Sequence, residues 1–269
     1  MKNDSFLLFE KLEMQMKRLA LISSFLAVKA EFEAEGTRID ELAILSELCC
    51  KNSISLTLKI GGPSAQRDIY EAFQLGATNI LVPMVESKYS LLNCFEMVQK
   101  FLPLFKDLTN TPKLFINIES QLALKNIISI LNLIEDENLP VESIVIGRSD
   151  LSKSLNIRDV DNEKMLNICN QLVKNRGNLK VALGGNLMKK SFSFISHLSK
   201  KGLYAFESRK CTFRTSEEIK KQNFNSLIDS ALEFELSWLN CKKNLYGDRS
   251  KEEDLRIKTI ESRLRNSII

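Results

Sequence analysis

The stretch at residues 55–87, SLTLKIGGPSAQRDIYEAFQLGATNILVPMVES, decides the fold class. It begins with a short apolar run, Ser55–Ile60, and closes with a second one, Asn79–Pro83. Between these runs, the apolar residues of Ala65–Leu75 recur at helical spacing. A strand, a helix and another strand in this order form a unit with two parallel strands, because the helix returns the chain to the same end of the sheet.

The same alternation continues on both sides of this unit. Further apolar runs predict strands at Phe25–Ala30, Leu114–Ile118, Ser143–Ile146, Lys180–Leu183 and Leu203–Phe206. Helical patterns lie at Arg38–Lys51, Tyr89–Phe105, Gln121–Ile134, Glu163–Asn175 and Leu187–Lys200. This order predicts an α/β fold, either a doubly wound sheet or a (β/α)₈ TIM barrel with an eighth strand that the pattern does not reveal. We expect the first barrel strand to be the missing one, its place taken by an amphipathic helix at Phe6–Ala20.

The chain length predicts one large domain, because α/β barrels often reach 250 residues or so and this chain has 269. We expect a TIM-barrel catalytic domain at residues 1–215 and a helical extension at 216–269. The extension begins where the alternating pattern turns wholly helical and charged. It is either a solvated appendage or an arm through which the chain forms a homo-oligomer.

Composition excludes several classes of protein. A net charge of +4 does not indicate a nucleic-acid-binding protein. The N-terminal residues do not resemble a signal peptide and no apolar run is long enough to span a membrane, so we expect a cytoplasmic protein with no membrane partner. The single histidine, His197, lies inside a helical pattern, which argues against histidine-based zinc, iron or nucleophile sites. The six cysteines form no C-x-x-C pair and are expected to be free thiols.

Polar, charged or glycine residues follow nearly every predicted strand. In parallel α/β folds the functional site lies at the carboxyl ends of the strands. Clusters after seven strands therefore describe a ring-shaped polar site, which favours the barrel over the open sheet. The clusters read EFEAEG at 31–36, KIGGP at 59–63, PMVES at 83–87, NIES at 117–120, GRSD at 147–150, GGN at 184–186 and ESRK at 207–210.

Glu119 and Asp150 are the strongest candidates for metal ligands. Each directly follows a strand, and carboxylate oxygens suit a hard cation such as Mg²⁺ or Mn²⁺. The alternative is structural: Asp150 caps a short helix and Glu119 favours the first turn of another through the helix dipole.

Cationic and glycine residues at the strand ends are the candidates for substrate contacts. Lys59 ends a buried strand, where it either stabilises an enolate oxygen or pairs with a barrel carboxylate. Arg148 and Arg209 each have a planar guanidinium group that can form two parallel hydrogen bonds to a carboxylate or phosphate. Gly61 supplies backbone N–H groups near a helix start, and Gly185 allows close approach of a ligand, although turn geometry explains a glycine pair equally well.

Three segments resemble the HpcH/HpaI aldolase and citrate lyase β-subunit family. They read LKIGGPSAQRDIYEAFQLGATNILVPMVES, INIESQLALKNI and IVIGRSDLSKSL, and the resemblance extends over roughly residues 25–210. It implies a barrel that holds Mg²⁺ or Mn²⁺ between Glu119 and Asp150 and acts on a 2-keto acid through a metal-stabilised enolate. It also implies substrate contacts at the shared motifs, with Glu86 in P-M-V-E-S and with Gly147 and backbone amides at Ser149 in the G-R-S-D segment.

The chain departs from that family at two points. Lys59 stands where the aldolases carry an arginine, and no histidine base follows an early strand, so Glu33 or Glu35 becomes the candidate acid/base. The expected activity is a metal-dependent aldolase or carbon–carbon lyase. A citrate-lyase-like reaction on an acyl thioester at the same metal site, and a barrel that binds a metabolite without turnover, are the alternatives.

Overall fold

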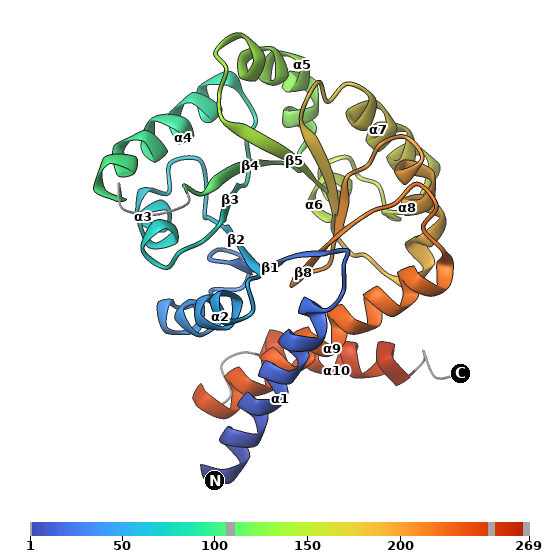
Figure 1. The fold of residues 1–269 in the computed structure, drawn as a ribbon. Helices are drawn as coiled ribbons and strands as arrows, with labels where there is room; N and C mark the ends of the chain where they lie inside the picture. The colour runs from blue at the N-terminus through green and yellow to red at the C-terminus, as the bar shows by residue number, and fades with distance from the viewer. Residues whose placement is uncertain (1, 106–110, 247–250, 266–269) are drawn as a thin grey trace.

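The barrel wall has eight strands in the part of the chain that the structure describes. The computed structural model describes residues 2–105, 111–246 and 251–265. The strands close into a ring in sequence order (Figure 1), which confirms the expected barrel, and all seven predicted runs are strands. They are β1 (Phe25–Glu31), β2 (Ser55–Lys59), β3 (Asn79–Val82), β4 (Lys113–Ile118), β5 (Val141–Gly147), β6 (Lys180–Gly184), β7 (Ala205–Glu207) and β8 (Cys211–Arg214).

Helices surround this ring (Figure 1), and several begin at polar capping residues. Ser87, Ser120 and Asn162 cap α4, α5 and α7, each accepting a hydrogen bond from a backbone N–H of the first turn. The α-helices are α1 (Lys2–Ala20), α2 (Ile39–Lys51), α3 (Gln66–Gln74), α4 (Lys88–Phe101), α5 (Gln121–Asp136), α6 (Arg148–Ser154), α7 (Glu163–Lys174), α8 (Phe192–Ser199), α9 (Lys221–Tyr246) and α10 (Lys251–Arg265), with short 3₁₀ segments at Leu102–Phe105 and Lys189–Ser191.

The strand that the sequence pattern concealed is the last one, not the first. β1 is the first barrel strand, and α1 precedes it without replacing it. β8 follows β7 through a hairpin and is antiparallel to both β7 and β1. No helix separates β7 from β8 and β8 is only four residues long, so neither the alternating pattern nor an apolar run marks it.

The strands separate two environments. Their outward side chains, such as Val28, Leu58 and Ile116, join the main apolar core under the helices. Their inward side chains form a much smaller apolar cluster that includes Leu81 and Val145. Period-2 alternation places lysine, asparagine and glutamate on the inner face at the carboxyl ends, so the barrel interior opens into a polar site there.

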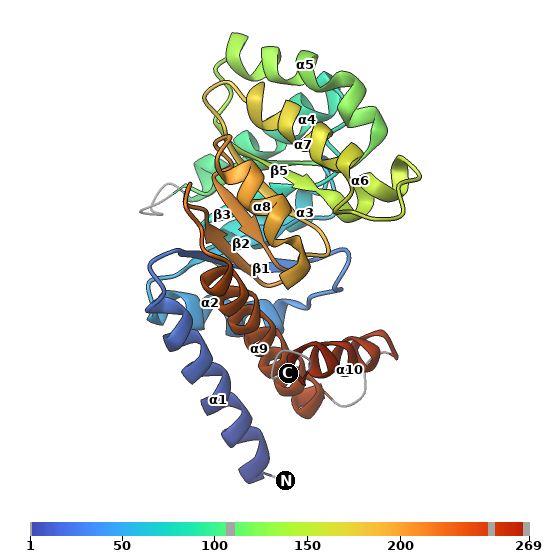
Figure 2. The same cartoon turned by 90° about the vertical axis from the view of Figure 1, so that its right-hand side faces the viewer.

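The C-terminal extension packs on its own barrel. α1 and α9 lie side by side next to β1 and β8, and α10 packs on α9 (Figures 1 and 2). Phe224, Phe234 and Trp238 of α9 belong to the same buried core as the barrel strands. Residues 247–250 and 266–269 of the predicted extension lie outside the described residues. Within the described part, no helix combines the length and the apolar character that crossing a bilayer requires.

Candidate active site

A cavity of about 770 Å³ opens at the carboxyl ends of the strands. Its wall combines residues from the strand ends with side chains from α9 and α10. A volume of this size is typical of small-molecule sites. More than half of the site residues predicted from the sequence line it: Lys59, Glu119, Gly147, Ser149, Asp150, Gly185 and Arg209.

Glu119 is held by three neighbours at the end of β4. Lys59 Nζ lies 3.3 Å from Glu119 Oε2, and the backbone N–H of Met84 donates to Oε1 at 3.1 Å. Asn117 Nδ2 also donates to Oε2. Burial raises the pKa of Glu119, and it outweighs the opposing effects of Lys59 and Met84; the negative charge of Asp150 raises this pKa further. The three neighbours therefore fix the Glu119 carboxylate in position.

Asp150 reaches the cavity from the first turn of α6. Its side chain is about half exposed and pairs with Lys153 at 2.9 Å. Gly147, not Asp150, is the residue at the start of this helix, so the predicted capping role does not apply. Asp150 and Glu119 line the same cavity, and the negative charge of Asp150 contributes to the raised pKa of Glu119.

The donor set of this region fits a hard cation. Among the described residues there is no group of three or more histidine, cysteine, aspartate or glutamate side chains that could hold a metal by themselves. The two carboxylates supply oxygen ligands, and Asn117 Oδ1 is buried beside Glu119 without a hydrogen-bond partner. Mg²⁺ is commonly held by one or two carboxylates, with water and substrate completing its shell. Glu119 and Asp150 therefore meet the minimum for such a site.

A second buried ion pair, which sequence reasoning missed, lines the same cavity. Lys29 of β1 donates to Glu207 at the end of β7, and its Nζ is 3.9 Å from Glu31. Burial alone lowers the pKa of Lys29, but attraction to Glu207 and Glu31 outweighs it and the pKa ends above its ordinary value. A lysine inside the apolar run Phe25–Ala30 was the available signal, since buried lysines are paired.

The sequence matches the HpcH/HpaI aldolase/citrate lyase family over residues 55–189, half of the chain. The chain belongs to this family. Membership supports an enzyme of lyase or aldolase type. The matched segment contains both candidate metal ligands, Glu119 and Asp150, and Lys59.

Solved structures share the fold at low sequence identity. A family protein from Burkholderia cenocepacia J2315 is 10% identical with a TM-score of 0.58, and the match covers 73% of this chain and 83% of that one. The citrate synthase SbnG is 16% identical with a TM-score of 0.56, covering 82% and 87%. A citrate lyase from Burkholderia xenovorans LB400 is 10% identical with a TM-score of 0.53, covering 90% and 83%. A search of curated proteins gives no match.

Arg148 does not contact the cavity of this HpcH/HpaI family member. The side chain is fully buried and donates to the backbone carbonyls of Gly184 and Gly185 at 3.2 and 2.9 Å, and it pairs with Asp161. The Phe194 ring covers the guanidinium. The structure thus corrects the predicted anchoring role: Arg148 holds the loops after β5 and β6 together.

Four other predicted residues also lie away from this cavity. Glu33 is exposed, and Glu35 pairs with Arg209 and Lys210 beside a different, smaller pocket. The Gly61 N–H donates a hydrogen bond of 2.7 Å to Asp68, so this donor is engaged within the protein instead of facing the cavity. Glu86 accepts a hydrogen bond from Ser120, the residue that caps α5. In the loop after β1, Glu31 is the carboxylate that lines the cavity.

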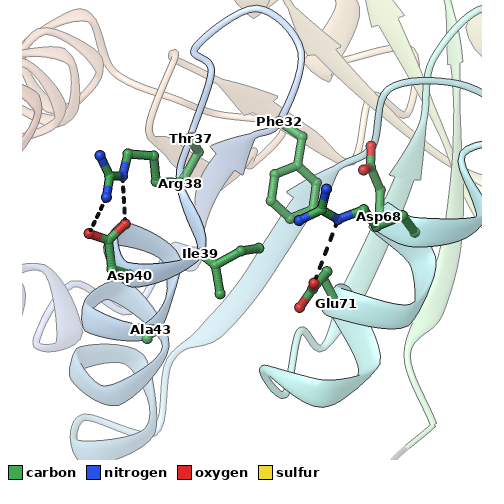
Figure 3. A pocket seen from close by; sticks show the side chains of 9 residues that line it. Phe32, Thr37, Arg38, Ile39, Asp40, Ala43, Asp68 and Glu71 are labelled. Atoms are coloured by element: carbon green, nitrogen blue, oxygen red, sulfur yellow. Dashed lines mark hydrogen bonds and ion pairs between the residues drawn. The ribbon is translucent and has the colours of Figure 1, made fainter. Parts of the chain in front are cut away.

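A different cavity of about 780 Å³ lies outside the barrel, between α2 and α3. Phe32 and Ile39 form its apolar part, as Figure 3 shows. Its charged side chains are engaged locally: Arg38 bonds Asp40, and Arg67 lies 3.9 Å from Glu71. This surface groove lacks the paired lysines and carboxylates that line the cavity at the strand ends.

Proposed function

We propose that the chain is a divalent-metal-dependent carbon–carbon lyase or aldolase that acts on a pyruvate-like 2-keto acid through a stabilised enolate. The observation that carries this proposal is that Glu119 and Asp150 line one cavity, with the Lys59 ammonium 3.3 Å from Glu119. The two carboxylates would hold Mg²⁺ or Mn²⁺. When bound, the metal would polarise the keto group and stabilise negative charge on the enolate oxygen.

The cationic side chains of the site suit this chemistry. In the cleavage direction, a 4-hydroxy-2-keto acid loses its hydroxyl proton, the C3–C4 bond breaks, and its electron pair forms the enolate while an aldehyde leaves. Protonation at C3 then completes the keto acid. Lys59 is only 13% exposed, so its charge acts on a developing enolate with little screening by water.

The proton of the hydroxyl group needs an acceptor in the cavity. Glu31 replaces Glu33 and Glu35 as the candidate, because it lines the cavity and they do not. It lies directly across from Lys59 in the pairing of β1 with β2. A carboxylate at this position takes the place of the histidine base that the chain lacks.

Exchange of the pyruvate methyl protons in D₂O, followed by NMR, tests the proposal. We expect exchange only with added Mg²⁺ or Mn²⁺, because enolate formation requires the metal, and we expect Glu119→Gln to reduce its rate at least about a hundredfold. Glu47→Gln is the matched control, since Glu47 is an exposed residue of α2 that pairs only with Lys51 among the described contacts.

The outcomes separate the alternatives. Metal-dependent binding of pyruvate without exchange would indicate a metabolite-binding barrel or an enzyme for another substrate, such as an acyl thioester. If calorimetry detects neither metal nor keto-acid binding to the wild-type protein, the proposal is wrong.

We also propose a homo-oligomer in a reducing, cytoplasmic environment. Leu255 of α10 is 67% exposed and supplies an apolar contact that a second copy would cover. The six cysteines are free, which suits a reducing compartment. The small-molecule keto acid is the partner to which the cavity is suited.

A further inference from the structure

The barrel interior holds a second cavity, of about 170 Å³, at the amino-terminal ends of the parallel strands. TIM-barrel interiors are usually filled by layers of bulky branched side chains, but three residues that line this cavity are alanines: Ala27, Ala182 and Ala205. These small side chains leave room, since a water molecule takes about 30 Å³ and the cavity is several times larger. We name this cavity the amino-terminal chamber. It is distinct from the cavity at the carboxyl ends of the strands, although Val145 and Glu207 line both.

Thr57 and Asn79 form a neutral polar pair in the wall of the chamber. They are only 3% and 7% exposed, and Asn79 Nδ2 donates a hydrogen bond of 2.9 Å to Thr57 Oγ1. Among the described residues, this bond leaves Asn79 Oδ1 without a donor and the Thr57 hydroxyl proton without an acceptor. Buried polar groups are normally hydrogen-bonded. A ligand hydroxyl group would satisfy both, because it accepts one hydrogen bond and donates another.

Lys113 lies beside this polar pair on the next strand. Thr57 of β2 is the register partner of Asn79 of β3, and Asn79 is the register partner of Lys113 of β4. All three side chains line the chamber, so they form a row across its wall. Neighbouring strands are about 4.8 Å apart. A small molecule can therefore place one group at Thr57 and Asn79 and a second group at Lys113.

The charges that line the chamber leave an excess of one positive charge. Lys113 and Lys180 share a single carboxylate, that of Glu142, at 2.9 and 2.5 Å. The other carboxylate of the lining, Glu207, is paired with Lys29. Lys113 and Lys180 are 57% and 41% exposed, so they mark the solvent end of the chamber. This end therefore favours an anionic group.

We propose that the amino-terminal chamber is a second binding site, which takes a small 2-hydroxycarboxylate of about the size of lactate. Its hydroxyl group lies at Thr57 and Asn79, its carboxylate lies at Lys113, and its carbon chain contacts the alanine side chains. In a 2-hydroxy acid the two polar groups are on adjacent carbon atoms, which suits the spacing of neighbouring strands. This site uses no residue of the candidate metal site and does not depend on the function proposed above.

Calorimetry without added metal, with lactate as the probe, tests this site. Propionate lacks the hydroxyl group and 1,2-propanediol lacks the carboxylate, so each removes one of the two proposed contacts. We expect lactate to bind at least about fivefold more tightly than either compound, because each loses a hydrogen bond to a buried or charged partner. Equal affinity for lactate and propionate would overturn the proposed role of Thr57 and Asn79.

Two variants of the chamber identify its contacts. We expect Thr57→Val, which removes only the hydroxyl group, to weaken lactate binding at least about fivefold. We expect Lys113→Gln to weaken it at least about threefold, since water partly screens an exposed ammonium. Lys51→Gln is the matched control: Lys51 is 58% exposed, pairs with Glu47 and lies on α2, away from the chamber. Thermal unfolding of each variant reports whether it is folded.

NMR of the wild-type protein with labelled alanine methyl groups locates the ligand without any substitution. We expect lactate to shift the methyl signals of Ala27, Ala182 and Ala205, which line the chamber and not the other cavity, and to leave that of Ala72 in α3 unchanged. No binding of lactate would mean that the chamber holds water only and would overturn the inference. Binding that is lost in Glu119→Gln but retained in Thr57→Val would place lactate in the other cavity and would also overturn it.

Discussion

Lys29 and Lys59 define the site at the level of single residues. Each is a buried or nearly buried lysine at the carboxyl end of a strand, and each faces a glutamate, Glu207 and Glu119 respectively. A Schiff-base lysine must be deprotonated to attack a carbonyl, whereas the pKa of Lys29 is raised by its carboxylate partners. Lys29 is therefore suited to an electrostatic role, which agrees with the enolate stabilisation that we propose.

Lys29→Met tests the strength of this buried pair. We expect a loss of about 3–5 kcal/mol in the free energy of unfolding, because Glu207 would keep a buried charge without its main partner. The raised pKa of Lys29 means that the stabilisation is complete below its ordinary value of 10.5 and is lost only as the pH rises through the folded-state value. The loss, measured by denaturant titration, should therefore be equal at pH 6 and pH 8.

The control for Lys29→Met is Lys113→Met at the amino-terminal end of the barrel. Lys113 pairs with Glu142 but is 57% exposed, so we expect a loss below about 1 kcal/mol. The double variant Lys29→Met/Glu207→Gln should recover part of the stability. Similar losses for Lys29→Met and Lys113→Met would contradict the burial argument.

At the scale of elements, the loops after β5 and β6 determine the shape of the cavity. Gly185 has φ +85°, and a Cβ on it would lie 2.4 Å from the Ser149 backbone nitrogen and 2.9 Å from that of Arg148. Only glycine allows the β6 loop to approach α6 so closely. Arg148 then fastens the two loops by its hydrogen bonds to Gly184 and Gly185.

Gly185→Ala tests this contact between loops. We expect a loss of more than about 2 kcal/mol in unfolding free energy, together with weaker keto-acid binding, because the backbone of α6 must move. Gly177→Ala is the control, since Gly177 also has a positive φ of +58° but a Cβ there meets nothing within 4 Å. The Gly177→Ala variant therefore measures only the cost of placing alanine at a positive φ, about 1 kcal/mol in unfolding free energy. Equal effects of the two changes in chemical denaturation would refute the steric explanation.

At the scale of the whole molecule, the extension and the barrel share one core in the described residues. Phe224, Phe234 and Trp238 of α9 belong to the same buried cluster as the outward face of the strands. Gln15 of α1 also donates to Glu233 of α9 at 3.4 Å. The sequence-based division at residue 215 marks a change of pattern, and the packing joins the two parts.

A single unfolding transition is the expected consequence. Trp238 is the only tryptophan and is 2% exposed, so its fluorescence reports on α9, while far-UV circular dichroism reports on all helices and strands. We expect the two signals to share one denaturation midpoint, because shared burial couples their unfolding. An earlier fluorescence transition would mean that the extension unfolds as a separate unit.

The amino-acid sequence by itself determined the order of strands and helices and the strand-end motifs. The order of strands and helices follows from local hydrophobic periodicity. The strand-end motifs are recognised by their residue types, as Glu119 and Asp150 illustrate. Tertiary structure decided what pattern cannot encode. Closure through the antiparallel β8, the burial of Arg148, the entry of Lys29, Glu31 and Glu207 into the cavity, and the approach of Arg256 and Arg263 from α10 all depend on contacts between residues far apart in the chain.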